Sequence, residues 1–378
     1  MKITIVLGAF LPVPPIMGGA VEKVWFALGQ EFARRGHEVT QISRALPQLP
    51  EKETIEGVRH LRIAGFDTPA SLLWLKFFDL VYSVRTKRRL PRADIIVTNT
   101  FWLPLFLRNS RLGKLYVHIG RFPKRQMCLY KHAARLQTPS RAVANAVAKE
   151  VPELEAKIVA IPYPRLETNG STGERATVER EKNILFVGRV HPEKGVHLLI
   201  DAFANAAAPL FSAWNLIIVG PTENRYGGGG KRYLDQLRRS ATRAAGRVEF
   251  RGAIFDPVAL SNEYRQAQIF AYPSLAEKGE SFGLAPLEAM AHGCAVVVSD
   301  LACFKDFIRD GETGSVFNHR GSDPAAALRA KLAALVANET WRSQFAAAGG
   351  RKSAEYSLPQ VADQFLADFE LLIAHEHG

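Results

Sequence analysis

The sequence predicts an α/β protein of two domains, each built around a mainly parallel sheet. Short apolar runs rich in β-branched residues alternate with segments of helical spacing along the whole chain. This alternation stops at residues 165–182, which have no apolar periodicity, and then begins again. A chain of 378 residues is also long for a single hydrophobic core.

The first half opens with a βαβ pattern. Residues 2–7, KITIVL, predict a buried strand rather than a signal peptide, because the apolar run is short and leads into prolines and a glycine pair. Apolar residues then recur at helical spacing, Gly36 is expected to cap that helix, and residues 37–43 resume as a strand. The helical positions are Val21, Val24, Trp25, Leu28 and Phe32, and further strands are expected at 58–63, 93–99, 114–119 and 157–162.

The second half repeats this plan, with strands expected at 183–190, 214–220, 247–252, 269–274 and 294–300. We therefore expect domains at 1–164 and 183–355, a linker at 165–182, and a C-terminal helix at 356–378 that crosses back to the first domain. Ligands of such sheets bind at the carboxyl ends of the strands. Two Rossmann-like domains facing across a cleft are the expected architecture.

The net charge of +12 is carried by the first half of the chain. Residues 1–168 contain 26 Lys and Arg against 13 Asp and Glu, whereas the remainder contains 23 against 24. Such an asymmetry indicates an anionic partner, either nucleic acid or a membrane surface. Neither an RNA-binding aromatic signature nor a zinc-finger spacing is present, so no nucleic-acid partner is expected.

Cysteine usage and hydropathy indicate the cellular compartment and the absence of a membrane span. Cys128, Cys294 and Cys303 are scattered and odd in number, which favours a reducing cytoplasm and excludes both a disulfide framework and a CxxC zinc site. No run reaches the roughly 18 apolar residues of a spanning helix.

Several candidate site residues lie at the ends of predicted strands. Gly18 and Gly19 precede the first helix, where small residues let backbone N–H groups approach a phosphate, or merely supply a flexible loop. His118 ends a strand, where a lone histidine is more often structural. Arg189 and Lys194 flank a proline-containing turn and either converge on a diphosphate or are ordinary surface charges.

Two glutamates surround a predicted helix start. Glu280 lies in a glycine-flanked loop, Pro286 is expected to open the helix, Glu288 to fall in its first turn and Gly293 to close it. The unpaired N–H groups at this helix start, within residues 283–286, would attract an anion. Because carboxylates repel phosphate, the two glutamates are better suited to hydroxyl groups on either side of it, which suggests a sugar nucleotide.

Four segments resemble the retaining glycosyltransferases of family 4, which have the two-domain GT-B fold. They are VPPIMGGAVEKVWFALGQEFARRGHEV, FVGRVHPEKGVHLLIDAF, AYPSLAEKGESFGLAPLEAMAHGCAVVVSD and IRDGETGSVF, and they cover almost the whole chain in the family's order. The Glu-x7-Glu and Gly-Arg…Lys-Gly segments are the most specific.

The resemblance implies a role for each matching residue. Arg189 and Lys194 would bind the donor diphosphate, Glu280 a hydroxyl of the donor sugar and Glu288 the ribose. The turn at Gly283, Leu284 and Ala285 would contact sugar and phosphate, and His118 would lie beside the transferred sugar. Gly18, Gly19 and Gly188 complete the expected donor site, and His118, Arg189, Lys194 and Glu280 are the expected catalytic residues.

The implied reaction is transfer of a hexose from a UDP- or GDP-linked donor, with retention of anomeric configuration. Arg189 and Lys194 can replace a metal at the leaving diphosphate, so no obligatory metal and no cofactor besides the substrate are expected. Two departures from the family concern HIGRFP, which lacks an aspartate after the histidine, and IPYPRLE at the expected hinge. GGGGK at 227–231 lacks the Ser or Thr of a nucleotide P-loop and is interpreted as a flexible loop.

The acceptor is suggested by residues 71–92, where an apolar, aromatic stretch leads into basic residues. Lys76, Asp79 and Ser83 form a narrow polar stripe. The segment is either a core helix followed by a solvated basic turn, or a helix resting on an anionic membrane near a lipid-linked acceptor. The membrane and acceptor candidates are Arg85, Lys87, Arg88, Arg89, Arg121, Lys124 and Arg125, with Arg92 close by.

The expected setting is bacterial polysaccharide or lipopolysaccharide assembly, in the cytoplasm and at the inner face of its membrane. A glycosyltransferase acting on a small soluble acceptor, an NDP-sugar 2-epimerase of the same fold, and a non-catalytic binding protein are the alternatives. An epimerase would act on the donor without any acceptor.

Overall fold

A computed structural model describes residues 1–69, 71–108, 111–166, 180–206, 208–244 and 246–374. The chain forms two compact units, one of residues 1–166 with 357–378 and the other of residues 167–356. Most of the expected linker, residues 167–179, lies outside the described part.

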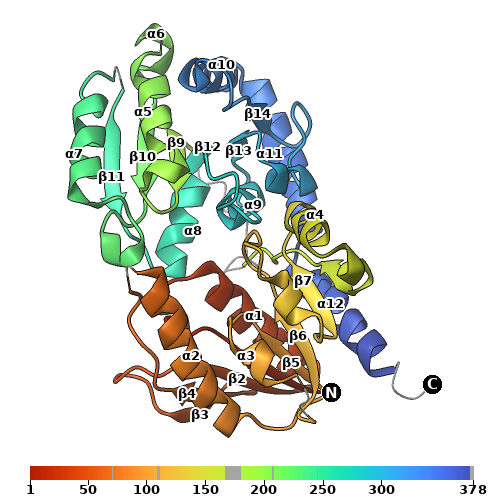
Figure 1. Cartoon of the computed structure of the whole chain (residues 1–378). Helices are drawn as coiled ribbons and strands as arrows, with labels where there is room; N and C mark the ends of the chain where they lie inside the picture. Colours follow the sequence, from red (N-terminus) through yellow and green to blue (C-terminus); the bar gives the residue numbers. More distant parts are fainter. Residues whose placement is uncertain (70, 109–110, 167–179, 207, 245, 375–378) are drawn as a thin grey trace. The chain divides into compact units, whose positions relative to one another are not determined.

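The first unit is an eight-stranded sheet covered by helices (Figure 1), in the order β3-β4-β2-β1-β5-β6-β7-β8. All pairs are parallel except β3 with β4. The strands are β1 Lys2–Val6, β2 Glu38–Arg44, β3 Lys52–Ile55, β4 Val58–Ile63, β5 Ile95–Thr98, β6 Lys114–His118, β7 Arg135–Thr138 and β8 Ile158–Ala160. The helices are α1 Ala20–Arg34, α2 Leu72–Arg89, α3 Leu103–Phe106, α4 Arg141–Glu150 and α12 Leu358–Ala374, with 3₁₀ turns η1 Met127–Tyr130 and η2 Pro152–Lys157.

The core of this unit follows from the apolar pattern. β1 buries Ile3, Ile5 and Val6 completely or almost so, as expected for a central parallel strand covered on both faces. α1 places Val24, Leu28 and Phe32 on one face, against the sheet.

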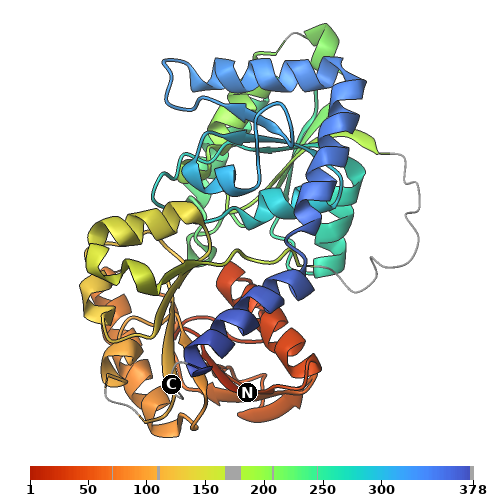
Figure 2. The ribbon, with the colours of Figure 1, turned by 90° about the vertical axis from the view of Figure 1, so that its right-hand side faces the viewer.

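Helix α12 belongs to the first unit although it follows the second in sequence. Its Asp368 accepts hydrogen bonds from the Tyr116 hydroxyl at 2.9 Å and from the Arg135 guanidinium at 2.5 and 3.1 Å. Phe369 packs edge-on against the rings of Tyr116 and Phe32. Figure 2 shows α12 lying beside α1, which it contacts.

The second unit is a six-stranded parallel sheet in the order β11-β10-β9-β12-β13-β14. Its strands are β9 Glu181–Val187, β10 Asn215–Val219, β11 Val248–Gly252, β12 Ala267–Tyr272, β13 Ala295–Ser299 and β14 Ser315–Phe317. Its helices are α5 Val196–Ala204, α6 Ala208–Phe211, α7 Gly230–Ala241, α8 Pro257–Gln266, α9 Leu284–Ala291, α10 Pro324–Ala337 and α11 Glu339–Ala354, with 3₁₀ turns η3 Pro192–Lys194, η4 Asn224–Tyr226 and η5 Ala302–Asp306.

The predicted fold class, α/β with two Rossmann-like sheets, is confirmed. Every strand expected from sequence is present, within a few residues of the expected bounds. Three strands were missed, namely β3, β7 and β14, because they are short or polar. Within the described residues, no helix combines the length and the apolar character that crossing a bilayer requires.

Candidate functional site

In the second unit, the predicted site residues gather where the strand order reverses. The chain runs from β9 outward to β10 and β11, and then returns to β12 on the other side of β9. The loops that follow β9 and β12 therefore leave the sheet side by side, in the position where open α/β sheets bind ligands. Lys194 lies in the first of these loops and Glu280 in the second.

Lys194 and Glu280 form a buried ion pair. The Leu275 N–H donates to the Glu193 carbonyl at 2.7 Å and joins the two loops. The Lys194 Nζ lies 2.6 Å from Glu280 Oε2, with side chains only 7% and 11% exposed. From sequence, these residues were expected to contact different parts of a ligand, whereas in the structure they bond directly to each other.

Glu280 also holds two hydroxyl groups that the sequence analysis missed. Tyr272 and Ser274 donate to the same Oε2 at 3.1 and 3.2 Å. Burial first, and then the charge of Glu280, raise the pKa of Tyr272 far above its usual value, so this hydroxyl stays protonated and remains a donor. Tyr272 is the last residue of β12 and Ser274 follows it. Their hydroxyl side chains at a strand end were the signal by which the sequence could have indicated them.

Arg189 lies at the edge of this cluster. Its guanidinium donates to the Gly227 carbonyl at 2.8 Å and to the Glu193 carboxylate at 2.6 Å, and the side chain is 42% exposed. Burial alone would raise the pKa of Glu193, but the charges of Arg189, Lys194 and His191 lower it overall. The loop after β9 thus carries two cations, Lys194 and Arg189. Of these, Arg189 remains accessible to an anion.

The glycine-rich segment 227–230 shapes the position of Arg189. Gly227 has φ +77°, and a Cβ there would lie 2.9 Å from the Arg189 Nη1 and 3.0 Å from its Cδ. Gly188 follows β9, and its carbonyl oxygen lies even closer to the Cβ position of Gly220, at 1.8 Å. The segment predicted as a merely flexible loop is therefore packed against a candidate site residue.

Substituting Gly227→Ala is expected to raise the KM for the donor about tenfold, with a smaller effect on kcat, because the added methyl group displaces the Arg189 guanidinium. Steady-state kinetics with varied donor concentration measure this effect. Gly311→Ala is the matched control, since Gly311 has φ +80° and no atom within 4 Å of the added Cβ. Equal effects of both substitutions would show that backbone strain alone is responsible.

Helix α9 begins two residues earlier than predicted. Gly283 takes the N-cap position with φ +97°, so Leu284 and not Pro286 is the first helical residue. A Cβ on Gly283 would lie 2.4 Å from the Phe304 ring, which requires glycine here. Pro286 is tolerated at the third position because N–H groups of a first turn have no partner within the helix. The predicted closure at Gly293 is confirmed, with φ +76° and the Cys294 N–H bonded to the Ala289 carbonyl.

The position of Glu288 changes accordingly. It lies in the second turn of α9 rather than the first, and it accepts a hydrogen bond from the Tyr264 hydroxyl at 3.1 Å. Burial, followed by the charge of Glu288, raises the pKa of Tyr264 well above its usual value. The backbone N–H groups of Leu284 and Ala285 lie in the first turn of α9.

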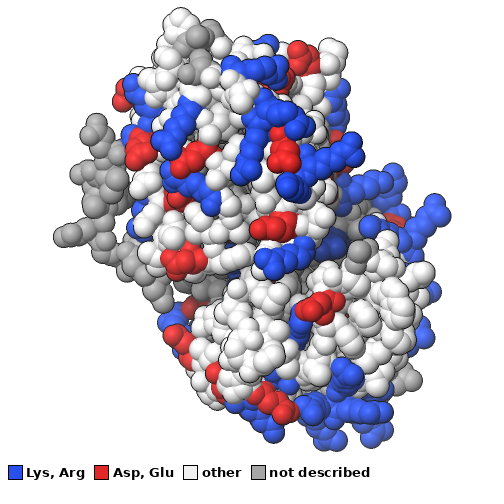
Figure 3. Space-filling view, turned by 90° about the vertical axis from the view of Figure 1, so that its left-hand side faces the viewer, with Lys and Arg blue, Asp and Glu red and all other residues white. Residues whose placement is uncertain are grey.

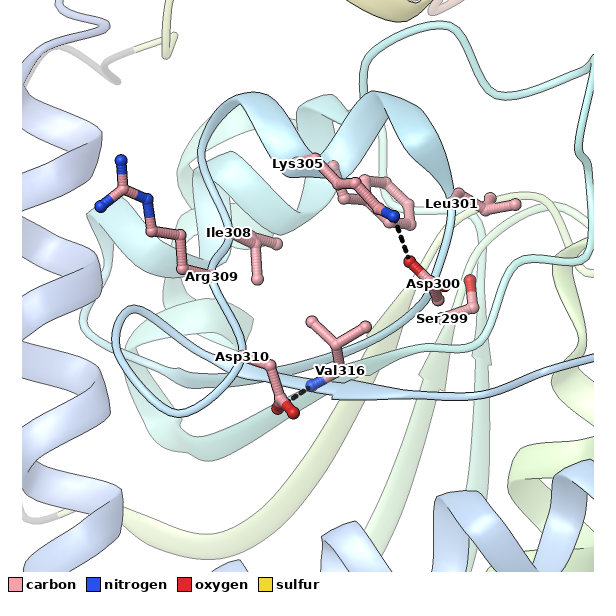
Figure 4. A pocket seen from close by; sticks show the side chains of 9 residues that line it. Ser299, Asp300, Leu301, Lys305, Ile308, Arg309, Asp310 and Val316 are labelled. Atoms are coloured by element: carbon pink, nitrogen blue, oxygen red, sulfur yellow. Dashed lines mark hydrogen bonds and ion pairs between the residues drawn. The ribbon is translucent and has the colours of Figure 1, made fainter.

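A separate cavity of about 400 Å³ opens beyond β13 (Figure 4), and its lining includes none of the predicted site residues. Lys305 pairs with Asp300 at 2.9 Å, and Asp310 accepts the Val316 N–H at 2.8 Å. Phe304 lines this cavity and also touches Gly283, so the cavity borders the start of α9.

In the first unit, the glycine pair opens α1 as predicted. Gly18 and Gly19 have φ of +79° and +96°, and Gly19 is the N-cap. A Cβ on Gly19 would lie 2.2 Å from the Glu22 Oε2, so the loop leaves room for this carboxyl group. Burial raises the pKa of Glu22 to about 7, although its own N–H and the charge of Arg121 oppose the shift. Glu22 was not predicted from the sequence. Its position three residues after a glycine N-cap was the only feature of the sequence that indicated it.

His118 is buried and has a hydrogen-bond partner at each ring nitrogen. The Gln137 Nε2 donates to the carbonyls of Thr138 and Ile161, so Gln137 must turn its Oε1 toward the His118 Nδ1, 2.5 Å away. The proton is therefore on Nδ1, and Nε2 accepts from the Tyr163 hydroxyl at 3.0 Å. Burial lowers the pKa of His118 to about 4, so the ring is neutral at pH 7.

Three curated relatives are mannosyl- or glycosyltransferases. The phosphatidyl-myo-inositol mannosyltransferase of Mycobacterium tuberculosis strain H37Rv is 36% identical over 191 residues, 50% of this chain and 47% of that one. The D-inositol 3-phosphate glycosyltransferase of Rhodococcus opacus is 32% identical over 51% of this chain and 41% of that one. The chain thus spans about half the length of these two relatives. The lipopolysaccharide core biosynthesis mannosyltransferase LpsB of Rhizobium meliloti is 27% identical over 83% of this chain and 89% of that one.

Solved structures show the same fold over the whole chain. Sucrose-phosphate synthase from Thermosynechococcus elongatus superposes with a TM-score of 0.80 at 20% identity, covering 99% of this chain and 100% of that one. WaaG, a glycosyltransferase involved in lipopolysaccharide biosynthesis, gives a TM-score of 0.71 at 15% identity, covering 96% and 98%. These are GT-B structures, as the sequence resemblance implied. The family described as glycosyl transferases group 1 matches residues 172–352, a range that includes Arg189, Lys194, Glu280 and Glu288. This segment of the chain is therefore similar to the group 1 glycosyl transferases.

Proposed function

We propose that the protein transfers a hexose from a nucleotide-diphosphate sugar to a hydroxyl group of a glycan or lipid-linked acceptor, in bacterial polysaccharide or lipopolysaccharide assembly. The observation that carries this proposal is the buried Lys194–Glu280 pair next to Arg189, at the strand-order reversal of the second sheet. The mannosyltransferase relatives support a mannose donor such as GDP-mannose. Because the matched family and the named relatives are transferases, the comparisons favour transfer over the 2-epimerase alternative.

The proposed reaction proceeds with retention of configuration and without an obligatory metal. The bond from the anomeric carbon to the β-phosphate oxygen breaks, and its electron pair leaves on the diphosphate. The acceptor oxygen bonds to the anomeric carbon on the same face, and its proton passes to the departing phosphate. Lys194 and Arg189 stabilise the charge that develops on the diphosphate, since fixed cations in a dry site act most strongly there.

Glu280 has two tasks in this proposal. It holds the Lys194 ammonium in place before the donor binds, and it accepts a hydrogen bond from a hydroxyl group of the donor sugar. When Lys194 turns toward phosphate, the Tyr272 and Ser274 hydroxyls continue to donate hydrogen bonds to the Glu280 carboxylate. Glu288 is assigned to the ribose, and the N–H groups of Leu284 and Ala285 to sugar and phosphate.

The acceptor and its location are part of the same proposal. Two of the relatives are named for phosphatidyl-myo-inositol and lipopolysaccharide core, which favours a lipid-linked acceptor reached from the inner face of the cytoplasmic membrane. The relative named for D-inositol 3-phosphate favours the alternative of a small soluble acceptor.

The test is incubation with GDP-mannose, UDP-glucose, UDP-galactose or UDP-GlcNAc, with phosphatidylinositol or inositol phosphate as acceptor and with EDTA present. We expect one donor to release its nucleotide in an acceptor-dependent manner, and NMR coupling constants to show an α-linked product from the α-linked donor. A β-linked product, or activity abolished by EDTA and restored by a divalent ion, would contradict the retaining or metal-free mechanism respectively. Conversion of the donor sugar without an acceptor would indicate the epimerase.

A further inference from the structure

Helix α2 is turned opposite to the usual orientation of a surface helix. Its buried residues are Asp79, Tyr82, Ser83 and Thr86, of which only Tyr82 belongs to the hydrophobic core. Asp79 and Ser83 belong to the polar stripe that the sequence analysis recognised. A helix in a soluble protein normally buries its apolar side and exposes its polar side. Here the polar side faces the protein.

Asp79 fixes this orientation. Its Oδ2 accepts the backbone N–H groups of Phe101 and Trp102, at 3.0 and 3.1 Å, where α3 begins. The Trp102 indole N–H in turn donates to the Lys76 carbonyl at 2.8 Å. Since these bonds join α2 to a neighbouring segment on its polar side, rotation of the helix to bury its apolar side would break them.

The outward side of α2 carries large apolar residues at helical spacing. We call Leu73, Trp74, Phe77 and Val84 the outer face of α2, and their exposed fractions are 82%, 56%, 49% and 37%. Trp74 and Phe77 lie edge to face, with ring centroids 5.7 Å apart. Phe78 supports both rings and stacks on Phe66 at 4.3 Å, so the aromatic cluster is held in place. A contiguous exposed cluster of this kind marks a binding surface.

Basic side chains border the outer face. Lys76, Arg85, Lys87, Arg88 and Arg89 are all exposed, and the acidic residue of the helix, Asp79, is buried. Lys76, Arg85 and Lys87 lie over the rings of Phe101, Phe66 and Phe106, which holds their charges close to the apolar surface. In the space-filling view (Figure 3), the surface of this unit shows a broad uncharged area with Lys and Arg gathered along its lower edge, while a few Asp and Glu lie toward its left and upper edges.

We propose that the outer face of α2 docks on the interface of a membrane that carries anionic lipids. Leu73, Trp74 and Phe77 would enter the boundary between headgroups and acyl chains, while the surrounding cations bind lipid phosphates. Apolar and aromatic side chains between fixed cations match such an interface in both polarity and charge. Arg121, Lys124 and Arg125, the other predicted candidates, lie exposed in the loop between β6 and η1 and are not part of this helix.

The experiment is co-sedimentation of the full chain with vesicles of phosphatidylcholine, alone or mixed with phosphatidylglycerol, at low and high salt and without donor sugar. We expect binding to the mixed vesicles at low salt and its weakening at high salt. The variant Leu73→Ser/Phe77→Ser should bind at least about tenfold more weakly, because two side chains no longer leave water. Both side chains are at least half exposed or nearly so, and circular dichroism should show an unchanged fold.

Matched controls separate this surface from general stickiness. Trp341→Ser removes a side chain of similar exposure, 49%, from α11 of the other unit, and should leave vesicle binding unchanged. Trp74→Phe should retain binding but remove the blue shift of tryptophan fluorescence that vesicles induce. Absence of binding at low salt would overturn the proposal, as would equal losses in the α2 and Trp341 variants. If the protein did not bind vesicles but formed a dimer that Phe77→Ser converts to a monomer, the surface would be a protein interface. The outcome is independent of the proposed transfer reaction, because no substrate takes part.

Discussion

The variant Lys194→Met is expected to lower kcat/KM for the nucleotide-sugar donor by at least about a hundredfold. The substitution keeps much of the buried aliphatic chain but removes the charge that we assign to the leaving diphosphate. Losing one such fixed group typically costs on the order of 3 kcal/mol in the barrier. Steady-state kinetics with the best donor and acceptor measure the effect. Near-normal transfer by this variant would remove Lys194 from the proposed mechanism.

Stability must be measured beside activity for this variant. Lys194 and Glu280 are almost fully buried, and breaking a buried ion pair on one side typically costs about 3 to 5 kcal/mol. Alanine at either position is therefore expected to lower stability as well as activity. In the Lys194→Met variant, Glu280 retains the Tyr272 and Ser274 hydroxyls, which reduces this cost.

The companion variant Glu280→Gln serves as the control. We expect the double variant Lys194→Met/Glu280→Gln to be less destabilised than the sum of the two single variants, because it leaves no unpaired charge in the core. Chemical denaturation of the four proteins measures this coupling. If activity were lost only in proportion to the unfolded fraction, the pair would be structural rather than catalytic.

The second large effect concerns Glu22. Glu22→Gln is expected to stabilise the first unit at pH 8 by up to about 3 kcal/mol, since the pKa of this carboxyl is raised by burial from 4.5 to about 7. Between these two values the folded carboxyl keeps its proton while the unfolded one releases it. The stability of the parent protein thus falls as pH rises from 4.5 to 7 and then levels off. The variant lacks this fall, so its advantage should be small at pH 4.5 and full at pH 8.

Denaturation of both proteins across this pH range measures the difference between them. His118 has the opposite dependence, because its pKa is lowered to about 4 and the parent gains stability as pH rises toward 6.5. That contribution is common to both proteins and cancels in the difference. Glu155→Gln, an exposed acid in the same unit, is the control and should show no such pH dependence. A destabilising carboxyl beside a glycine loop indicates a functional demand at that position.

The fold was predictable where a strand is long and apolar, as in β1 and β13. It was not predictable for β7, Arg135–Thr138, which has one apolar residue among four and draws its stability from both neighbouring strands. This omission had a consequence for the site. Gln137, on that strand, sets the protonation of His118, and a sequence pattern alone does not place two residues 19 positions apart on adjacent strands.

The site was predictable in its residue types and in its location at strand ends. The contacts within it were not, because they depend on register and helix phase. Glu288 lies two residues deeper in α9 than expected, because the helix begins at Leu284 rather than at Pro286. The polar stripe of α2 was recognised, but which side of the helix faces the protein depends on bonds from Asp79 to residues more than 20 positions away.

The placement of α12 has a consequence for the order in which the protein is assembled on the ribosome. The first unit keeps Tyr116, Arg135 and the face of α1 unsatisfied until Asp368, Phe365 and Phe369 have been synthesised. The second unit, in contrast, is one uninterrupted stretch of chain. The second unit can therefore complete its core before the first unit does. The first unit stays incomplete until α12 has been synthesised.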